Sequence, residues 1–184
     1  SVDFVGSPLA EVSGKLSSRV ATLVEAGVAV AVEARSLEEA NNRLLALAYG
    51  LEEEIDADVA PAHITLSTNP AFRFPKAEAG EAGVLLAREC VRDLVSYAVG
   101  CIFGRYSLDE PRLILADQGA TPQDFFAQVP SPTFRPDVDN VIPLVDDGWF
   151  EDDIVERFRQ FLRAAFGAEH FEENLRFVEE SLGV

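Results

Sequence analysis

Positive charge is scarce in this sequence. Fifteen lysines and arginines stand against 32 aspartates and glutamates, which gives a formal net charge of −17, and only Lys15 and Lys76 are lysines. Proteins bind the phosphate backbone of nucleic acids through clustered positive charge, so this balance argues against a broad nucleic-acid-binding surface. It leaves room for a few local arginine contacts. A soluble acidic surface is the ordinary interpretation of the charge, and DNA mimicry is the more specific one.

Long apolar runs and paired cysteines are also missing. The longest apolar segment, residues 26–32, is interrupted by Gly27 and is far shorter than the roughly 18 residues of a membrane span, so we predict none. No basic region followed by an apolar run opens the sequence, so we expect no secretory signal and a cytoplasmic protein. Cys90 and Cys101 would lie about 16 Å apart along one predicted helix, too far for a disulfide. We expect two buried, reduced thiols.

Signatures of catalysis are absent or incomplete. The sequence has no Gly-x-Gly-x-x-Gly loop, no Gly-x-Ser-x-Gly elbow and no Cys-x-x-Cys pair, and its two histidines lie in no triad-like or zinc-like pattern. Asn69-Pro70 follows a strand-like run, as the Asn-Pro-Pro-aromatic motif of amino-group DNA methyltransferases does, but the second proline is missing. An ordinary Asn-Pro turn is therefore the preferred interpretation.

Carboxylates cluster between residues 137 and 153. A metal site would need several of them to converge on one ion, and the spacing of an EF-hand is absent. Residues 151–153 fall in the first turn of a predicted helix, where the helix dipole favours negative charge, so capping is the preferred interpretation. Trp149 and Phe150 beside them predict a hydrophobic anchor or a small docking patch for a neighbouring domain.

The composition predicts a folded, mainly α-helical protein. The 184 residues are 48% hydrophobic and 26% charged, which suits one domain or one core with an appended lobe. Apolar periodicity predicts helices over residues 8–25, 36–49, 80–103, 150–167 and 168–182. A few short extended segments, or a small β element, are expected at residues 63–68, 113–116 and 141–144. Residues 125–126 are expected to form one helical turn.

The predicted helices carry identifiable boundaries. Ser36 to Glu39 is a capping box that opens the helix ending before Gly50, and its inward-facing residues are expected to be Ala40, Leu44, Leu47 and Ala48. Gly27 is a candidate interruption of the preceding helix, and residues 28–34 could continue as helix or form a short strand. The wide apolar arc of residues 80–103 places that helix at the centre of the core.

Arginines near the end of the helix at 80–103 are the best candidates for contact with DNA phosphates. Arg105 and Tyr106 follow Gly104 at the helix exit, where arginine could pair with phosphate and tyrosine could hydrogen-bond or stack. The alternative, which the sequence favours, is an arginine that complements the helix dipole and a packed tyrosine. Arg88 and Arg92 lie one turn apart and could extend a narrow basic stripe.

Several segments resemble one known family. Residues 38–51, 64–74, 94–109 and 137–182 are similar to the large adenine-specific DNA methyltransferases of BREX phage-exclusion systems, the PglX family. The resemblance spans residues 37–182, and residues 1–36 are not matched. We therefore predict an N-terminal helical segment, residues 1–36, and a spacer region, residues 37–184.

The resemblance implies a function for the parent enzyme more than for this chain. Such enzymes methylate an adenine amino group in DNA with S-adenosylmethionine as part of phage defence. None of the family's catalytic or cofactor motifs falls on this chain, so we expect no cofactor in it and no activity alone. The implied role is a helical spacer between catalytic and target-recognition domains, with DNA, the remaining domains and other BREX proteins as partners.

Two other functions are open from the sequence. The chain could be an acidic protein-interaction module or DNA mimic that docks a partner through Trp149 and Phe150. It could also be a metal-dependent enzyme that uses the carboxylates of residues 137–153.

Overall fold

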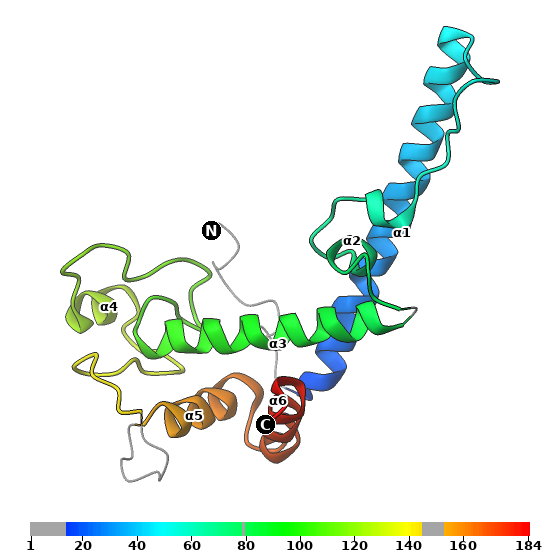
Figure 1. Ribbon diagram of the computed structural model, residues 1–184. Coiled ribbons are helices and arrows are strands. Elements are labelled where there is room, and N and C mark those ends of the chain that lie inside the picture. The colour runs from blue at the N-terminus through cyan, green and yellow to red at the C-terminus, as the bar shows by residue number, and fades with distance from the viewer. Residues whose placement is uncertain (1–13, 79, 145–152) are drawn as a thin grey trace. The chain divides into compact units, whose positions relative to one another are not determined.

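The structure is a computed structural model that describes residues 14–78, 80–144 and 153–184 (Figure 1). These residues form helices and no strand, which confirms the mainly α-helical prediction. The elements in chain order are α1 (Leu16–Tyr49), the 3₁₀ helix η2 (Pro61–His63), α2 (Pro70–Arg73), α3 (Glu81–Ile102), α4 (Pro122–Gln128), α5 (Ile154–Phe166) and α6 (Phe171–Leu182). None of the described helices is sufficiently long and apolar to cross a membrane.

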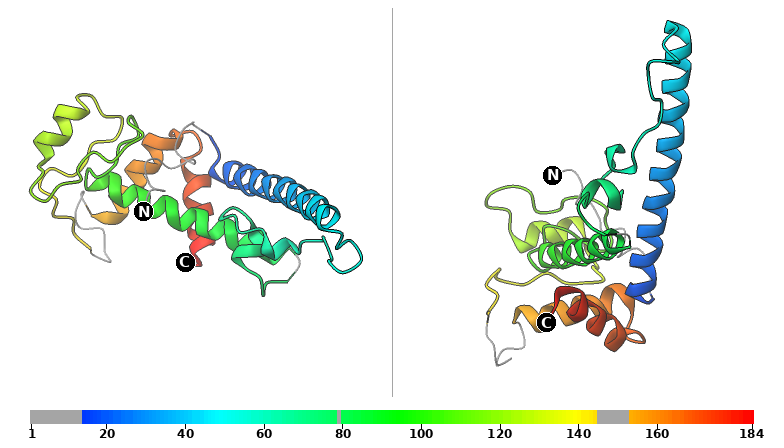
Figure 2. Two further views of the ribbon diagram at one scale, coloured as in Figure 1. Left: turned by 90° about the horizontal axis from the view of Figure 1, so that it is seen from above. Right: turned by 45° about the vertical axis from the view of Figure 1, so that its right-hand side comes forward.

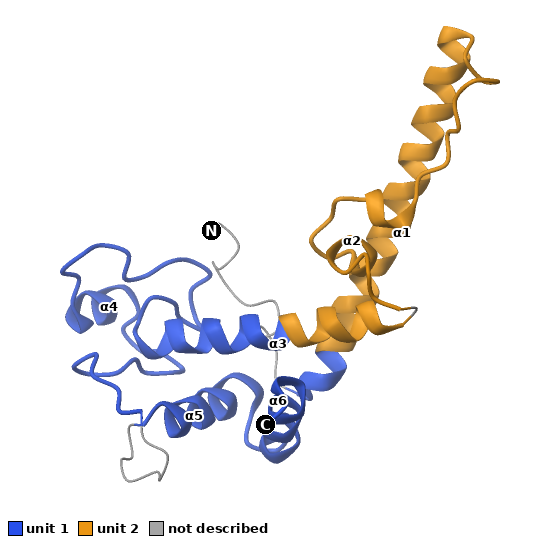
Figure 3. Cartoon of the chain, in the orientation of Figure 1, with its two compact units in different colours: residues 1–19, 90–184 blue, residues 20–89 orange. Residues whose placement is uncertain are grey.

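The chain divides into two compact units (Figure 3). The first unit comprises residues 1–19 and 90–184, and the second comprises residues 20–89. Both long helices contribute to the two units, because α1 begins in the first and continues in the second, and α3 begins in the second and ends in the first. The predicted division at residue 36 stays a prediction based on the resemblance.

The helix α1 is continuous over 34 residues, so Gly27 does not interrupt it, and of the two alternatives for residues 28–34 the continued helix is correct. Gly27 lies inside the helix because the chain passes close to it: a Cβ there would lie 2.6 Å from the carbonyl oxygen of Thr68. The predicted helix start at Ser36 is wrong. Instead of capping, Glu39 accepts hydrogen bonds from Arg35 and from the backbone N–H of Val59.

The segment after α1 returns along that helix in both views of Figure 2. Three side chains of α1 hold it: Glu39 binds the N–H of Val59, Asn42 donates to the carbonyl of Ala57, and Arg43 lies 3.1 Å from Asp58. The pKa of Glu39 is lowered mainly by the hydrogen bond from the N–H of Val59 and next by the hydrogen bond from Arg35. Residues 63–68, predicted to be a short strand or an extended segment, form no strand: His63 ends η2, Ile64 has extended backbone angles, and residues 67–68 form a turn.

One face of α1 was misassigned in the sequence analysis. The residues expected to point inward, Ala40, Leu44, Leu47 and Ala48, are all exposed. The residues that pack against the returning segment are smaller, and Gly27, Ala31 and Ala46 are the buried ones. The apolar residues do lie on one side of α1, as their period predicts. That side is exposed, however, because no described segment of the second unit packs on it.

Both long helices end in the same way. The residues Gly50 and Gly104 have positive φ values of 68° and 70°, which only glycine adopts without strain. After α1, the N–H of Leu51 bonds to the carbonyl of Ala46, and after α3 the N–H of Arg105 bonds to the carbonyl of Gly100. These six-residue bonds are Schellman motifs, so the predicted stop at Gly50 is confirmed.

The core of the first unit is built around the last turns of α3. Its buried residues Val91, Leu94, Ala98 and Ile102 confirm the central position predicted for this helix. The other large buried side chains come from α1, α4, α5, α6 and the connecting loop, namely Leu16, Phe125, Phe134, Phe161, Leu162, Phe166, Phe171 and Val178.

The terminal helices start later than predicted. Asp153 caps α5, since its carboxylate accepts hydrogen bonds from the N–H groups of Val155 and Glu156. The helix α6 begins at Phe171 and lies next to α5 (Figure 1). Its buried Asn174 accepts a hydrogen bond from the N–H of Leu16 at 2.8 Å, which joins α6 to the start of α1.

Candidate nucleic-acid interface

Arg105 stands at the exit of α3 on a backbone that is fixed from both sides. Its N–H donates to the carbonyl of Gly100, and its own carbonyl accepts a hydrogen bond from the N–H of Ile114 at 2.8 Å. The preceding Gly104 is buried, and a Cβ there would lie 3.0 Å from a methyl group of Leu115. The side chain of Arg105 is nevertheless exposed, so the fold presents a guanidinium at a defined point of the surface.

Tyr106 is engaged within the chain. Its ring stacks on that of Tyr97, with centroids 5.4 Å apart and ring planes 24° apart, and it covers the backbone of Gly100. Because Tyr97 occupies one face of this ring, that face is not available to stack on a nucleic-acid base. The geometry matches the packed-tyrosine alternative of the sequence analysis, and a contact of Tyr106 with DNA stays a prediction.

The loop that follows Arg105 is secured by Asp109. Its carboxylate accepts hydrogen bonds from the hydroxyl of Ser107 and from both the N–H and the hydroxyl of Thr133, the last at 2.6 Å. The phenol of Tyr97 donates to the carbonyl of Ser107 at 2.8 Å. These bonds connect the end of α3 to a segment more than 20 residues downstream, so Arg105 is mounted on a braced loop.

Neither cysteine forms a disulfide. Burial raises the pKa of Cys101 to about 12, although a hydrogen bond with Tyr97 acts in the opposite direction. Burial likewise raises the pKa of Tyr97, so both groups are neutral near pH 7. Cys101 is buried as expected, whereas Cys90 is only half-buried.

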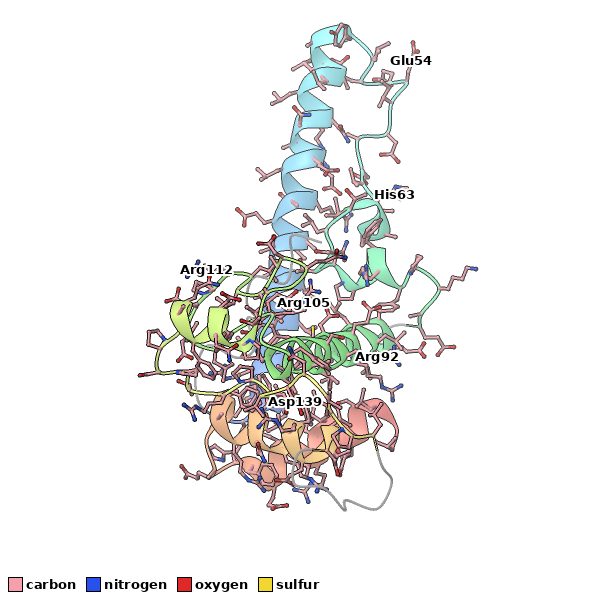
Figure 4. The ribbon with its side chains drawn as sticks, turned by 90° about the vertical axis from the view of Figure 1, so that its left-hand side faces the viewer. Glu54, His63, Arg92, Arg105, Arg112 and Asp139 are labelled. Carbon is pink, nitrogen blue, oxygen red and sulfur yellow. The ribbon has the colours of Figure 1, made fainter. Side chains whose placement is uncertain are left out.

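Four exposed arginines form no ion pair or side-chain hydrogen bond among the described residues, namely Arg88, Arg92, Arg105 and Arg176. The first three are the candidates predicted from the sequence, and Figure 4 labels Arg92 and Arg105. By contrast, several arginines pair with carboxylates or lie over aromatic rings, namely Arg19, Arg35, Arg43, Arg73, Arg112, Arg135, Arg157, Arg159 and Arg163.

Arg92 and Arg105, which both belong to the first unit, do not form a compact cluster. From Arg92 to the end of α3 at Ile102 the helix axis advances about 15 Å. For these two residues the separation suits two independent contacts along an extended polyanion and excludes a shared pocket for one phosphate. Arg88 lies one turn before Arg92 on α3, so this separation does not apply to that pair.

Asn69 is fully occupied by structural hydrogen bonds. The side chain is buried, its amide nitrogen donates to the carbonyls of Pro61 and Ile64 at 2.8 Å each, and its oxygen accepts from the N–H of Ala71. It is the N-cap of α2, with Pro70 at the first helical position. The predicted turn is thus a helix cap, and the amide has no free group to offer a substrate amine.

The acidic run is only partly within the described residues. Asp137 and Asp139 close local turns by accepting hydrogen bonds from the backbone two residues ahead, and Asp153 caps α5. The remaining candidates of this region lie outside the described residues, namely Asp146, Asp147, Trp149, Phe150, Glu151 and Asp152. Within the described part of the chain, no group of three or more histidine, cysteine, aspartate or glutamate residues could hold a metal ion.

The second unit contains a groove that sequence reasoning missed. Its volume is about 630 Å³, and it lies between α1, η2, α2 and the loop before α3. Alanines and prolines make up most of its wall, with Arg35 at the edge already bound to Glu39. The only available signal was the density of small residues and prolines in the returning segment, which does not by itself predict a groove.

Two curated proteins are similar to this chain, although no protein-family model matches it. The chain is 40% identical, over 121 residues or 65% of its length, to "Adenine-specific methyltransferase BrxX" of Escherichia coli O9:H4 (strain HS). It is 32% identical, over 148 residues or 79% of its length, to "Adenine-specific methyltransferase PglX" of Lacticaseibacillus casei (strain Zhang). In each case the match covers 10% of the relative, so the chain spans about one tenth of the length of these proteins.

Proposed function

Because this chain is related to the PglX family of BREX adenine-specific methyltransferases and corresponds to about one tenth of their length, we propose that it is a non-catalytic helical spacer of such an enzyme. Its role is to set the distance and angle between the catalytic and target-recognition domains on DNA. A base-modifying enzyme needs this, since the flipped base and the base-reading element must be engaged together. Adenine, S-adenosylmethionine and the other BREX proteins are partners of the parent enzyme in this proposal.

The state of Asn69 is the observation that carries the non-catalytic part. Asn69-Pro70 is the one dipeptide of the chain that resembles a methyltransferase motif, and its amide is consumed by a helix cap and two buried carbonyls. The described residues do not fit S-adenosylmethionine either, since they contain neither a glycine-rich loop nor a strand to precede one. We therefore assign the cofactor to the other parts of the enzyme.

The length of the helices supports a spacer role. At 1.5 Å per residue, α1 is about 51 Å long and α3 about 33 Å long. Each is closed by a glycine in a Schellman motif, so its end is defined. A helix of this length fixes the distance between its two ends much more rigidly than a loop does.

Direct contact with DNA, if the spacer makes it, falls on the unpaired arginines. Arg88, Arg92 and Arg105 are available to phosphates, whereas the net charge of −17 opposes any broad attraction to DNA. Contacts of this kind position the enzyme without reading sequence. Trp149 and Phe150 stay the predicted docking residues for a neighbouring domain.

Two binding measurements test this function. Titration calorimetry with S-adenosylmethionine is expected to show no binding, and stoichiometric binding would contradict the assignment of the cofactor to other domains. Fluorescence anisotropy with a short DNA duplex at low and moderate salt tests the arginines. We expect weak binding that falls with salt and is weaker, with a shallower salt dependence, in the variant Arg88→Ala/Arg92→Ala/Arg105→Ala.

The matched control removes three exposed arginines that already have carboxylate partners, Arg43→Ala/Arg112→Ala/Arg159→Ala. Each lost phosphate contact lowers the slope of log affinity against log salt by about 0.9, so the test variant should lower it by about 2 to 3. An equal loss in both variants would show a general charge effect. Absence of binding by the unaltered chain would reject DNA contact and leave a rigid strut.

A further inference from the structure

The outer face of α1 is defined here by four large aliphatic residues, Val30, Leu37, Leu44 and Leu47. Their side chains are 52%, 65%, 67% and 63% exposed, respectively. The first three are spaced by seven residues and therefore lie in one stripe, with Leu47 one turn beyond Leu44. Exposed alanines complete the same side of the helix, namely Ala26, Ala29, Ala40 and Ala48.

The packed side of α1 departs from the usual pattern of a surface helix beyond its first turns. An amphipathic helix normally buries its large apolar residues and exposes polar ones. The start of α1 follows this rule, since Leu16 and Val20 are buried. From residue 26 to the end of the helix, however, the buried residues are Gly27, Ala31 and Ala46, whose small size lets the returning segment approach the helix closely. The outer face thus has the composition of a core without a cover in its own unit, which marks an interaction surface.

Charge narrows the choice of partner. The chain as a whole carries a net charge of −17, yet Glu33 is the only charged residue among those on the outer face. A basic or acidic ligand finds little to pair with there, so the partner must present an uncharged aliphatic helix. A second copy of α1 presents this surface by identity.

The sequence repeat favours a helix pair in particular. Val30, Leu37 and Leu44 are spaced by seven residues within α1, and the half-buried Leu23 extends this row toward the start of the helix. A seven-residue spacing of aliphatic residues is the period of coiled coils. The positions flanking the stripe are mostly alanine, serine and asparagine, so like charges do not oppose two identical helices at the edges.

We propose that α1 pairs in antiparallel orientation with α1 of a second copy of this chain, through the outer face. A parallel pair in register would set Glu33 against Glu33, two carboxylates in an apolar seam. An antiparallel pair with its two-fold axis near Leu37 brings Val30 level with Leu44 of the second copy. It also separates the two Glu33 carboxylates and places each near Arg43. This inference does not rest on the proposed spacer function.

Analytical ultracentrifugation of the full chain tests the pairing. We expect a concentration-dependent dimer, and the variant Leu37→Glu/Leu44→Glu should raise its dissociation constant by tenfold or more, because charges would enter the seam. The control Val84→Glu places the same charge on an aliphatic residue of α3 that is 54% exposed, and it should leave the dimer unchanged. Circular dichroism verifies that the helices persist in both variants.

The outcomes that would overturn the proposal are distinct. A wild-type chain that stays monomeric rejects self-pairing and leaves the face to another polypeptide segment. A dimer that survives Leu37→Glu/Leu44→Glu places the contact elsewhere. The variant Glu33→Gln decides the orientation: marked strengthening of the dimer would indicate a parallel pair, whereas an antiparallel pair should be affected little.

Discussion

The ring of Tyr106 lies directly over Gly100, two residues before the end of α3. A Cβ at position 100 would lie 2.6 Å from Cε2 of that ring, a separation that folded proteins do not tolerate. The same ring stacks on Tyr97, so the absence of a side chain at Gly100 lets the chain fold back over its own helix. This contact directs the loop that carries Arg105.

Substitution Gly100→Ala should therefore displace Tyr106. We expect a loss of about 1–3 kcal/mol in the free energy of unfolding, as for other overpacked cores. Urea denaturation gives the value. In the double variant with Tyr106→Ala, the two effects should fail to add, since the small residue removes the clash. Full additivity would mean that the ring does not rest on Gly100.

Asn69→Ala should act on stability. The change removes the cap of α2 and leaves the buried carbonyl of Ile64 without its donor, so we expect a loss of about 2 kcal/mol or more. Asn42→Ala is the matched control, because Asn42 makes a single 3.4 Å bond to the carbonyl of Ala57. Thermal unfolding of both variants compares them, and equal melting temperatures would contradict the structural role of Asn69.

The sequence predicted the positions of helices better than the surfaces they bury. The apolar period of residues 80–103 located α3 to within about one residue at each end, and its wide apolar arc matches its central place in the first unit. Gly50 and Gly104 were recognisable as stops because a left-handed C-terminal residue is a local requirement. Helix period and glycine position were therefore sufficient to locate these helices and their ends, because both depend on neighbouring residues in the sequence.

The errors arose where a distant segment decides the outcome. Gly27 resembled a helix breaker, but it accommodates Thr68, some 40 residues later. Ser36 and Glu39 matched a capping box, yet Glu39 binds the N–H of Val59. The face of Leu44 and Leu47 was correct as an apolar stripe and wrong as a buried one, because periodicity does not reveal whether the covering surface belongs to the same chain.

The candidate arginines illustrate a second limit. Position in sequence suggested Arg88, Arg92 and Arg105, and the structure adds that they are exposed while most other arginines are engaged. Sequence reasoning could not foresee that separation, since pairing depends on contacts such as Arg163 over Phe171. The packed ring of Tyr106, by contrast, matches the alternative that the sequence favoured.

Asn174→Ala should loosen the start of α1. The side chain accepts from the N–H of Leu16 and donates to the carbonyl of Gly14, so its loss leaves a buried amide without an acceptor. We expect a cost of about 1–3 kcal/mol. Hydrogen exchange provides a local readout, because the amide of Leu16 should lose protection more than amides in the middle of α3. Unchanged exchange at Leu16 would contradict this contact.

Alkaline pH should destabilise the first unit through Cys101. Burial raises the pKa of this thiol from 9.0 to about 12, so between these values the unfolded chain loses the proton while the folded chain keeps it. The folded state then binds more protons, and stability falls as pH rises through this window. Cys101→Ala should flatten that part of the profile, measured as the urea midpoint against pH.

A thiol-specific reagent added at neutral pH should label Cys90 before Cys101, because only the half-buried thiol is accessible without unfolding. Rapid labelling of Cys101 in the folded chain would contradict its burial and remove the reason for the alkaline loss.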